Sequence, residues 1–184
     1  MKQRRFNWEV WLDNTKKVDN SFNFYLKKEL IKVEEETKYI PISHLKKAEY
    51  NFRFVNFLED NKVFYDWIII GCYYTIYHCA LALITKKGFS SKNHLATLCT
   101  LIKCYYKKLT KEEFELVSVS SLKKEEVSYF VYAKEKREIA SYGISEEFNK
   151  STALDLRKKT VEFLNRTREI IEENVKSEIN IPIQ

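Results

Sequence analysis

The chain has 184 residues, of which 45% are hydrophobic and 15% aromatic, enough for one domain with a substantial core. Only three glycines and two prolines are present, and so few turn-forming residues favour long helices over a fold of many short strands. The net charge of +6, from 32 basic and 26 acidic residues, permits contact with an acidic partner such as RNA but does not require one.

The first 20 residues are basic and aromatic, with Arg4, Arg5, Trp8 and Trp11. Such a segment can stack on single-stranded nucleic acid, or it can dock on the rest of the protein through its tryptophans. Residues 7–14 fit either one helical turn or a short strand, and the residues that follow are expected to form a loop. The N-terminus shows no apolar stretch typical of a signal peptide, so we expect a cytoplasmic protein.

Two helices are predicted before the middle of the chain. Apolar residues recur at helical spacing over 21–36, and Pro41 ends this pattern. Ser43 is expected to open a second, strongly aromatic helix over 43–60. No alternating pattern is strong enough to predict a strand.

The stretch 66–87 is the centre of the predicted fold. From Trp67 to Thr85 it holds no charged residue, and apolar side chains occupy every phase of the helical period. A helix of this kind is either the buried centre of a bundle or a membrane span. Its tyrosines, histidine and glycine are too polar a set for the hydrocarbon core of a membrane, so the buried helix of a bundle is favoured. Asp66 is the expected N-cap and Gly88 the expected C-terminal stop.

Four more helices are predicted from helical spacing, polar N-caps and glycine stops. They begin at His94 after turn or cap residues Ser90 and Ser91, after a Thr110 cap, over 123–142 before Gly143, and at Ser151 or Thr152. The predicted architecture is therefore an all-α up-and-down helical bundle around residues 66–87.

Neither a metal nor a cofactor is predicted. The four cysteines form no CxxC pair, the histidines have no HxxxH or HExxH spacing, and no glycine-rich phosphate loop exists. Buried free thiols are expected instead.

The three histidines have different predicted environments. His44 is expected to cap a helix or face solvent, and His78 to be hydrogen-bonded in the core. His94 opens a helix, where the positive end of the helix dipole should make it less basic.

A late basic cluster is the predicted site of anion binding. Arg137 has Lys134, Lys136 and Tyr142 near it, and a guanidinium can hold phosphate. The alternative is that these side chains belong to a solvated helix face.

Three segments together resemble the HEPN superfamily of bacteria and archaea. They are LKKAEYNFRFV from Leu45, YDWIIIGCYYTIYHCALALITKKGFSSKNHLATLC from Tyr65, and AKEKREIASYG from Ala133. The resemblance covers roughly 45–173, and its central segment is the most specific. It divides the chain into an N-terminal extension (1–40), a HEPN-like bundle (41–177) and a tail (178–184).

The resemblance implies a helical bundle that commonly forms homodimers. Many such proteins are metal-independent endoribonucleases with an Arg-x4–6-His motif, and others partner minimal nucleotidyltransferases in toxin–antitoxin pairs. The motif's arginine would be Arg137, but the positions for its histidine hold Tyr142, Gly143 and Ile144. Tyrosine, with a pKa of about 10, is a poor proton acceptor near neutral pH.

Two main functions therefore remain open, beside a third, that of a nucleotide-sensing accessory domain. The first is a binding module that lacks the nuclease motif, forms a homodimer, and partners a nucleotidyltransferase, RNA or a nucleotide through Arg137, Lys134, Lys136 and Tyr142. The alternative is a metal-independent endoribonuclease with an altered site, in which Arg137 acts with Tyr142, His94 or His78.

Overall fold

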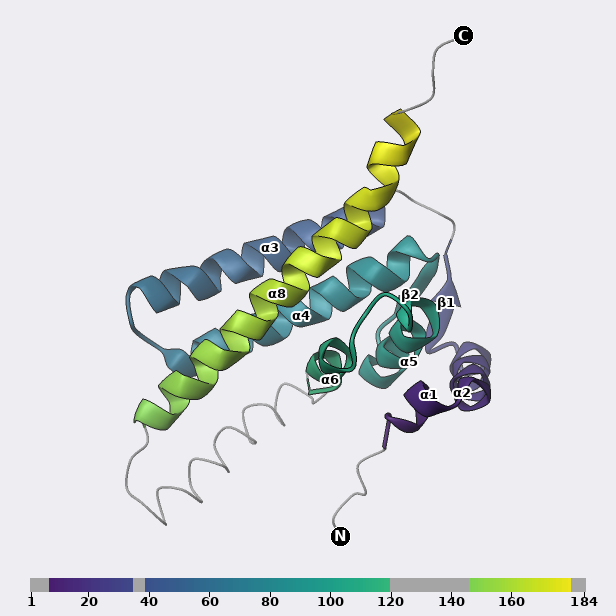
Figure 1. The fold of residues 1–184 in the computed structure, drawn as a ribbon, viewed down its shortest axis with the longest axis horizontal. Coiled ribbons are helices and arrows are strands. Elements are labelled where there is room, and N and C mark those ends of the chain that lie inside the picture. Colours follow the sequence, from purple (N-terminus) through teal and green to yellow (C-terminus); the bar gives the residue numbers. More distant parts are fainter. Residues whose placement is uncertain (1–6, 35–38, 120–145, 180–184) are drawn as a thin grey trace.

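A helical hairpin forms the centre of the molecule. The computed structural model describes residues 7–34, 39–119 and 146–179. Within them α3 (Tyr39–Asp60) and α4 (Tyr65–Lys86) lie side by side and are joined by a short connection, as Figure 1 shows. The long helix α8 (Glu146–Ile179) runs diagonally over this pair. This arrangement confirms the predicted all-α bundle around the apolar helix.

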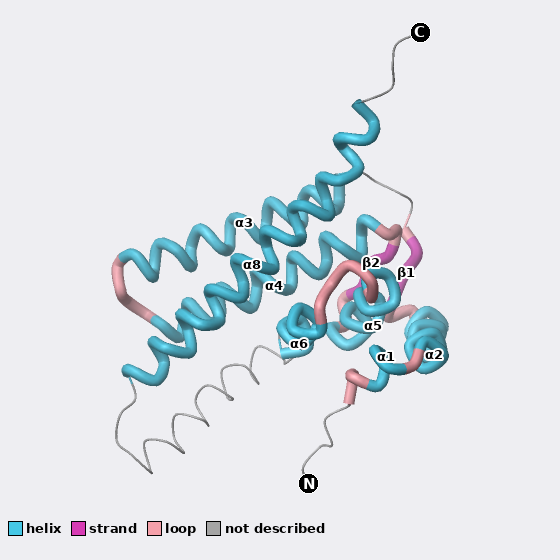
Figure 2. Tube along the Cα trace, viewed as in Figure 1, coloured by secondary structure: helices cyan, strands magenta, loops and turns pink. Residues whose placement is uncertain are grey.

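Shorter elements form a group beside the C-terminal half of α4, as Figure 1 shows. They are α1 (Val10–Asp13), α2 (Thr15–Lys27), α5 (His94–Tyr105) and α6 (Lys111–Val119), together with strands β1 (Ile31–Val33) and β2 (Phe89–Ser91). The strands pair antiparallel with Lys32 opposite Ser90, and Figure 2 shows this small sheet in magenta beside the helices. Phe22 of α2 packs edge-on against Phe89, with ring centroids 5.2 Å apart, which ties the N-terminal helices to the sheet.

The apolar helix α4 is the core of the bundle. It is long and apolar enough to cross a membrane by length and composition, but 72% of its most apolar window is buried inside the protein. Burial on this scale is typical of a core helix. At Gly71 an added Cβ would lie 2.5 Å from Cγ2 of Val55, so the absence of a side chain lets α3 approach closely.

The contact between α4 and α8 repeats every seven residues. The buried thiol of Cys72 lies beside Thr160, and that of Cys79 lies beside Thr167. Burial raises the pKa of both thiols to about 12, so they stay protonated, as expected for buried free cysteines. At the edge of this contact Arg168 donates to Glu49 on α3 over 2.8 Å.

The N-terminal segment differs from its prediction. The expected loop after residue 13 is instead the start of α2, where the Asn14 side chain accepts from the Lys17 amide at 3.1 Å. The helix predicted over 21–36 ends at Lys27, because Glu29 takes a left-handed conformation (φ 55°) and the chain then enters β1. The alternative of a docked N-terminal arm is confirmed for Trp11, which is 2% exposed and donates to Ser21 at 2.9 Å.

Strands were not predicted, and that prediction was wrong. Each strand has only three residues, too few for an alternating pattern, and each is stabilised by a partner almost 60 residues away. Ser90 and Ser91, expected as turn or cap residues, lie in β2. The predicted start at His94 is confirmed, but the Asn93 side chain caps α5 by accepting from the Ala96 amide at 2.9 Å.

Three helix starts also need correction. Helix α3 begins at Tyr39 because Pro41 falls in its first turn, where a proline costs no hydrogen bond. Helix α4 follows Phe64 in a left-handed conformation with no side-chain cap, so Asp66 lies in the first turn instead of capping it. Helix α8 begins at Glu146, before the expected Ser151 or Thr152. The helix predicted over 123–142 lies outside the described residues.

Candidate functional site

Two turns of α4 bring polar aromatic side chains to one side of the core helix. Tyr73 and Tyr77 are four residues apart, which places their rings on the same side of a helix. The rings stack with centroids 6.5 Å apart and an angle of 10°. His78 follows directly, with its ring 6.2 Å from that of Tyr77. This stretch of α4 therefore carries two phenols and one imidazole within two turns.

On the side of α3, His78 meets a second histidine. The Nδ1 atoms of His44 and His78 lie 3.1 Å apart, a hydrogen-bond distance at which one ring donates and the other accepts. Burial lowers the pKa of His44, and burial together with the charges of His44 and Lys47 lowers the pKa of His78 to about 4. Both imidazoles are therefore neutral near pH 7, because burial disfavours the charged form of each ring.

On the side of α5, His94 meets the two tyrosines. Its Nε2 atom lies 3.2 Å from the hydroxyl of Tyr73, and its ring centroid lies 4.4 Å from that of Tyr77. Burial lowers the pKa of His94, in the direction expected for this helix-terminal residue. Burial, with Tyr74 and Tyr77, raises the pKa of Tyr73 to about 12, so its phenol keeps its proton.

These contacts form one continuous set, which we name the histidine–tyrosine row: His44, His78, Tyr77, Tyr73 and His94. It crosses α4 from α3 to α5. Neutral imidazoles can accept protons and neutral phenols can donate hydrogen bonds, so the row can bind a polar group or take part in proton transfer. In the described part of the chain, no three His, Cys, Asp or Glu side chains converge in a way that could hold a metal ion.

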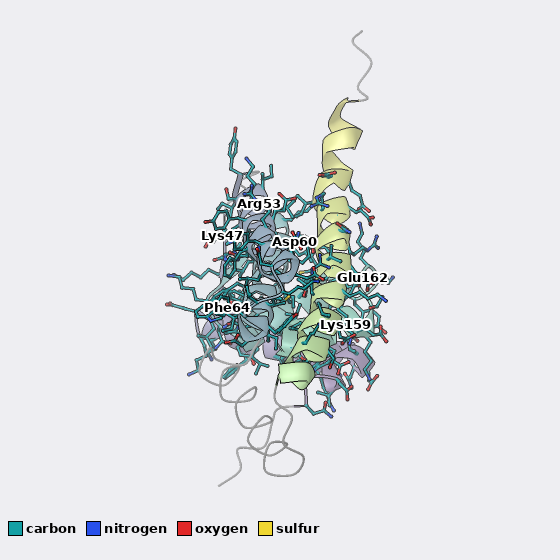
Figure 3. All side chains as sticks on the ribbon, turned by 90° about the vertical axis from the view of Figure 1, so that its left-hand side faces the viewer. Lys47, Arg53, Asp60, Phe64, Lys159 and Glu162 are labelled. Carbon is teal, nitrogen blue, oxygen red and sulfur yellow. The ribbon has the colours of Figure 1, made fainter. Side chains whose placement is uncertain are left out.

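The helix α3, its connection to α4 and the first turn of α4 expose many large apolar side chains. We name this surface the open α3–α4 face; its members are Tyr39, Ile40, Ile42, Tyr50, Phe54, Phe57, Val63, Phe64 and Trp67. Phe57 is 61% exposed and Trp67 is 50% exposed. Figure 3 shows Lys47 and Phe64 on the side of α3 that points away from α8. The cation of Lys47 lies 4.7 Å from the Tyr50 ring, so basic groups accompany the aromatic ones.

The structure places some predicted site residues and not others. His78 and His94 belong to the same row, on opposite sides of it. His44 was expected at a helix cap or in solvent; it is half-buried against His78 because the hairpin aligns positions 34 residues apart. Tyr73 and Tyr77 were not predicted as site residues, although their four-residue spacing indicates a shared side of the helix. Lys134, Lys136, Arg137 and Tyr142 lie outside the described residues.

A family model describes most of this bundle. The model of the HEPN domain matches residues 43–177, almost three quarters of the chain. The chain belongs to the HEPN domain family. This HEPN match begins in the first turns of α3 and contains the whole histidine–tyrosine row.

A curated relative is also similar to this HEPN protein. It is "Putative toxin MJ0142" of Methanocaldococcus jannaschii, 29% identical over 116 residues, which cover 62% of this chain and 71% of the relative. No solved structure matches the HEPN chain.

Proposed function

We propose that this protein is a HEPN binding module of the toxin–antitoxin type, which works through a protein partner and lacks the family's Arg-x4–6-His nuclease motif. The family match and the relative named as a toxin support this class. Because Tyr142, Gly143 and Ile144 stand where the histidine is required, RNA cleavage is not its expected activity. A cytoplasmic location and action without a metal or cofactor are parts of this proposal.

The open α3–α4 face is the observation that carries the proposal. Most of the exposed large apolar side chains in the described residues lie between residues 39 and 67. A surface with many exposed aromatic and apolar side chains, accompanied by basic residues, is characteristic of a protein–protein interface. A second copy of the chain is the first occupant that we propose, in an isologous contact.

Sedimentation with paired variants tests the interface. At micromolar concentration the wild-type protein should have twice the 22.1 kDa chain mass. Phe57→Glu and Trp67→Glu should each shift the protein to a monomer, because a buried unpaired carboxylate opposes association. Phe24→Glu is the control, since Phe24 is similarly exposed (55%) but lies on α2. A wild-type monomer, or equal behaviour of all three variants, would contradict the proposed interface.

The antitoxin that we propose is a minimal nucleotidyltransferase. The partner class rests on the family resemblance, and the exposed aromatic side chains give such a protein apolar anchors. Co-expression with a nucleotidyltransferase encoded beside this chain should yield a complex that survives gel filtration. If the two proteins elute separately over a range of salt concentrations, the nucleotidyltransferase is not the partner.

The histidine–tyrosine row favours a second candidate, a metal-independent endoribonuclease with an altered site. Cleavage needs a group that removes the 2′-hydroxyl proton, and the neutral His78 and His94 have the right protonation state. We expect no cleavage of single-stranded RNA in EDTA. If the purified protein cuts RNA, and if His78→Asn, His94→Ala or Tyr142→Phe abolishes cutting without loss of fold, the ribonuclease replaces the binding module.

A further inference from the structure

The imidazoles of His44 and His78 face each other through the same ring nitrogen. Their Nδ1 atoms lie 3.1 Å apart, and both rings are partly accessible to solvent. His44 lies in the second turn of α3 and His78 in the second half of α4. Two separate helices, packed against each other, therefore hold two nitrogen lone pairs at a fixed spacing.

This spacing suits two ligands of one metal ion. Zn–N bonds are about 2.0–2.1 Å long, so two nitrogens on one ion at an angle of about 90–110° lie roughly 2.9–3.4 Å apart. The observed 3.1 Å between the Nδ1 atoms falls within this range. The ion would lie to one side of the line that joins the two nitrogens, so each ring must turn slightly, but neither helix has to move.

The protonation state of the pair is also suitable for a metal ion. An imidazole binds a metal through a nitrogen that carries no proton. Burial lowers the pKa of both histidines, so both rings are neutral near pH 7 and no proton has to be released to the solvent. The ring that donates the hydrogen bond only has to move its proton from Nδ1 to Nε2, after which both Nδ1 lone pairs are free.

The ligand set decides which ion fits. Imidazole nitrogen suits Zn²⁺, Ni²⁺ and Cu²⁺, whereas Mg²⁺ and Ca²⁺ prefer oxygen ligands. Among the described residues, no third His, Cys, Asp or Glu joins the pair to complete a metal site. Water must therefore fill the other positions, and such an ion exchanges with the solvent more readily than one in a closed structural site with four protein ligands.

The pair lies towards the open end of the α3–α4 hairpin. Residues 61–64 connect the two helices at the opposite end, as Figure 1 shows, and the close contact of Gly71 with Val55 lies between the connection and the pair. A metal ion bound by both histidines would therefore be a second cross-link between α3 and α4, far from the first.

We propose that His44 and His78 bind an exchangeable Zn²⁺ ion that fastens the open end of the α3–α4 hairpin. Both Nδ1 atoms are ligands of the ion, and water completes its coordination. The partner binding proposed above needs no metal; the ion instead restrains α3, which carries much of the open α3–α4 face. The metal site itself is independent of that interface.

Calorimetry on the full chain, freed of metal with EDTA and transferred to buffer near neutral pH, tests the site. Zn²⁺ should bind, as should Ni²⁺ and Cu²⁺, but not Mg²⁺. His44→Asn and His78→Asn should each weaken Zn²⁺ binding at least tenfold, because one of two protein ligands is lost. His94→Asn is the matched control and should bind Zn²⁺ like the wild-type protein, since the Nε2 atom of His94 faces the Tyr73 hydroxyl instead of a second imidazole.

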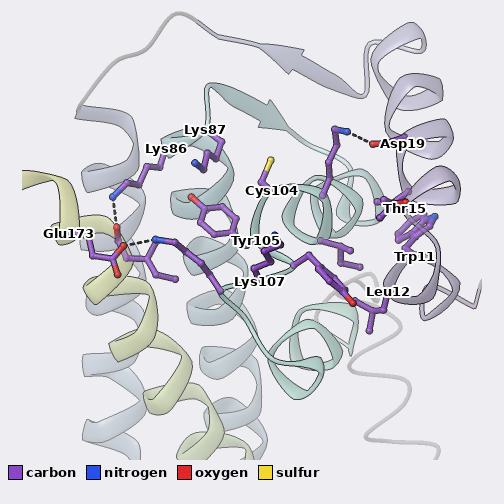
Figure 4. Close-up of a pocket in the computed structure, with 16 residues that line it drawn as sticks. Trp11, Leu12, Thr15, Asp19, Lys86, Lys87, Cys104, Tyr105, Lys107 and Glu173 are labelled. Carbon is purple, nitrogen blue, oxygen red and sulfur yellow. Dashed lines mark hydrogen bonds and ion pairs between the residues drawn. The ribbon is translucent and has the colours of Figure 1, made fainter.

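A spectroscopic measurement identifies the ligands directly. The electron paramagnetic resonance spectrum of the Cu²⁺-loaded protein should show coupling to two imidazole nitrogens in the wild type and to one in His44→Asn or His78→Asn. The partly exposed thiol of Cys104, in the wall of the cavity that Figure 4 shows, is the other candidate ligand. Cys104→Ser should therefore leave Zn²⁺ binding unchanged. Phe57→Glu should bind Zn²⁺ normally whether or not the proposed interface exists.

A nearby cation supplies a variant that should tighten binding. The charge of Lys47, one turn after His44, contributes to the lowered pKa of His78, and it opposes a bound metal ion in the same way. Lys47→Ala should bind Zn²⁺ more tightly than the charge-matched control Lys46→Ala, at an exposed neighbouring site. The proposal is overturned if Zn²⁺ does not bind, if His94→Asn weakens binding as much as His78→Asn, or if the Cu²⁺ spectrum of the wild type lacks coupling to two imidazole nitrogens.

Discussion

At the residue scale, Gly71 shows how one missing side chain sets the distance between two helices. A Cβ at this position would lie 2.5 Å from Cγ2 of Val55, closer than packed carbon atoms approach. We expect Gly71→Leu to lower the free energy of unfolding by about 1–3 kcal/mol, because α3 must move to admit the larger side chain. Urea denaturation measures this loss, with Lys46→Leu as the control at an exposed site on α3. An unchanged midpoint for Gly71→Leu would contradict the close packing.

The histidines make a second prediction at this scale, for the dependence of stability on pH. Burial lowers the pKa of His44, His78 and His94, to about 4 for His78, below the value of about 6.5 in an unfolded chain. Between these values the unfolded chain binds more protons, so the free energy of unfolding should decrease as the pH falls from about 6.5 towards 4. Above pH 7 the histidines should cause no change.

Denaturation at pH 7, 6 and 5 checks this slope. The double variant His44→Asn/His78→Asn should lose stability less steeply over this range than the wild-type protein, because it has fewer groups to protonate. The carboxylates Glu112 and Glu173, whose pKa values are lowered, titrate below this range and therefore do not obscure it. Equal slopes in the two proteins would show that the pair does not control acid sensitivity.

At the element scale, α6 depends on a reciprocal cap at its N-terminus. The hydroxyl of Thr110 accepts from the Glu113 amide at 3.3 Å, and the Glu113 carboxylate accepts from the Thr110 amide at 2.7 Å, so the predicted Thr110 cap is confirmed. Thr110→Ala should destabilise the protein by about 0.5–2 kcal/mol because helix amides lose their acceptor. In thermal denaturation, Thr110→Ala should have a lower melting temperature than the control Glu115→Ala, which changes an exposed acid of the same helix. Similar melting temperatures of the two variants would contradict the cap.

At the scale of the whole molecule, the open α3–α4 face and the basic segment around Arg137 have separate roles in our proposals. For that segment we expect an anion such as RNA to bind in a salt-sensitive manner. Arg137→Ala should weaken binding more than Lys134→Ala, because only a guanidinium offers two parallel donors to phosphate. Fluorescence anisotropy with labelled RNA measures this difference; equal effects of the two variants would contradict a specific role for Arg137.

The sequence by itself determined those helices, helix starts and helix ends that depend on residues close together in the chain. The uncharged stretch from Trp67 to Thr85 forms a core helix because apolar side chains occur on every side of it, and its stop follows from Gly88, which has a φ of +74°. The start of α5 and the cap at Thr110 were also predictable, since each depends on side chains within a few residues.

Only the tertiary structure decided which distant residues meet. The pairing of β1 with β2 and the contact of His44 with His78 join residues 34 or more positions apart. The spacing of residue types along the chain does not show which of such distant residues come together. Another case is the cavity lined by Asp19, Lys87 and Glu173, because these residues come from three separate helices or their ends. Their common location arises from the packing of α2 and α8 around the end of α4, which burial of apolar side chains drives and which no local pattern specifies.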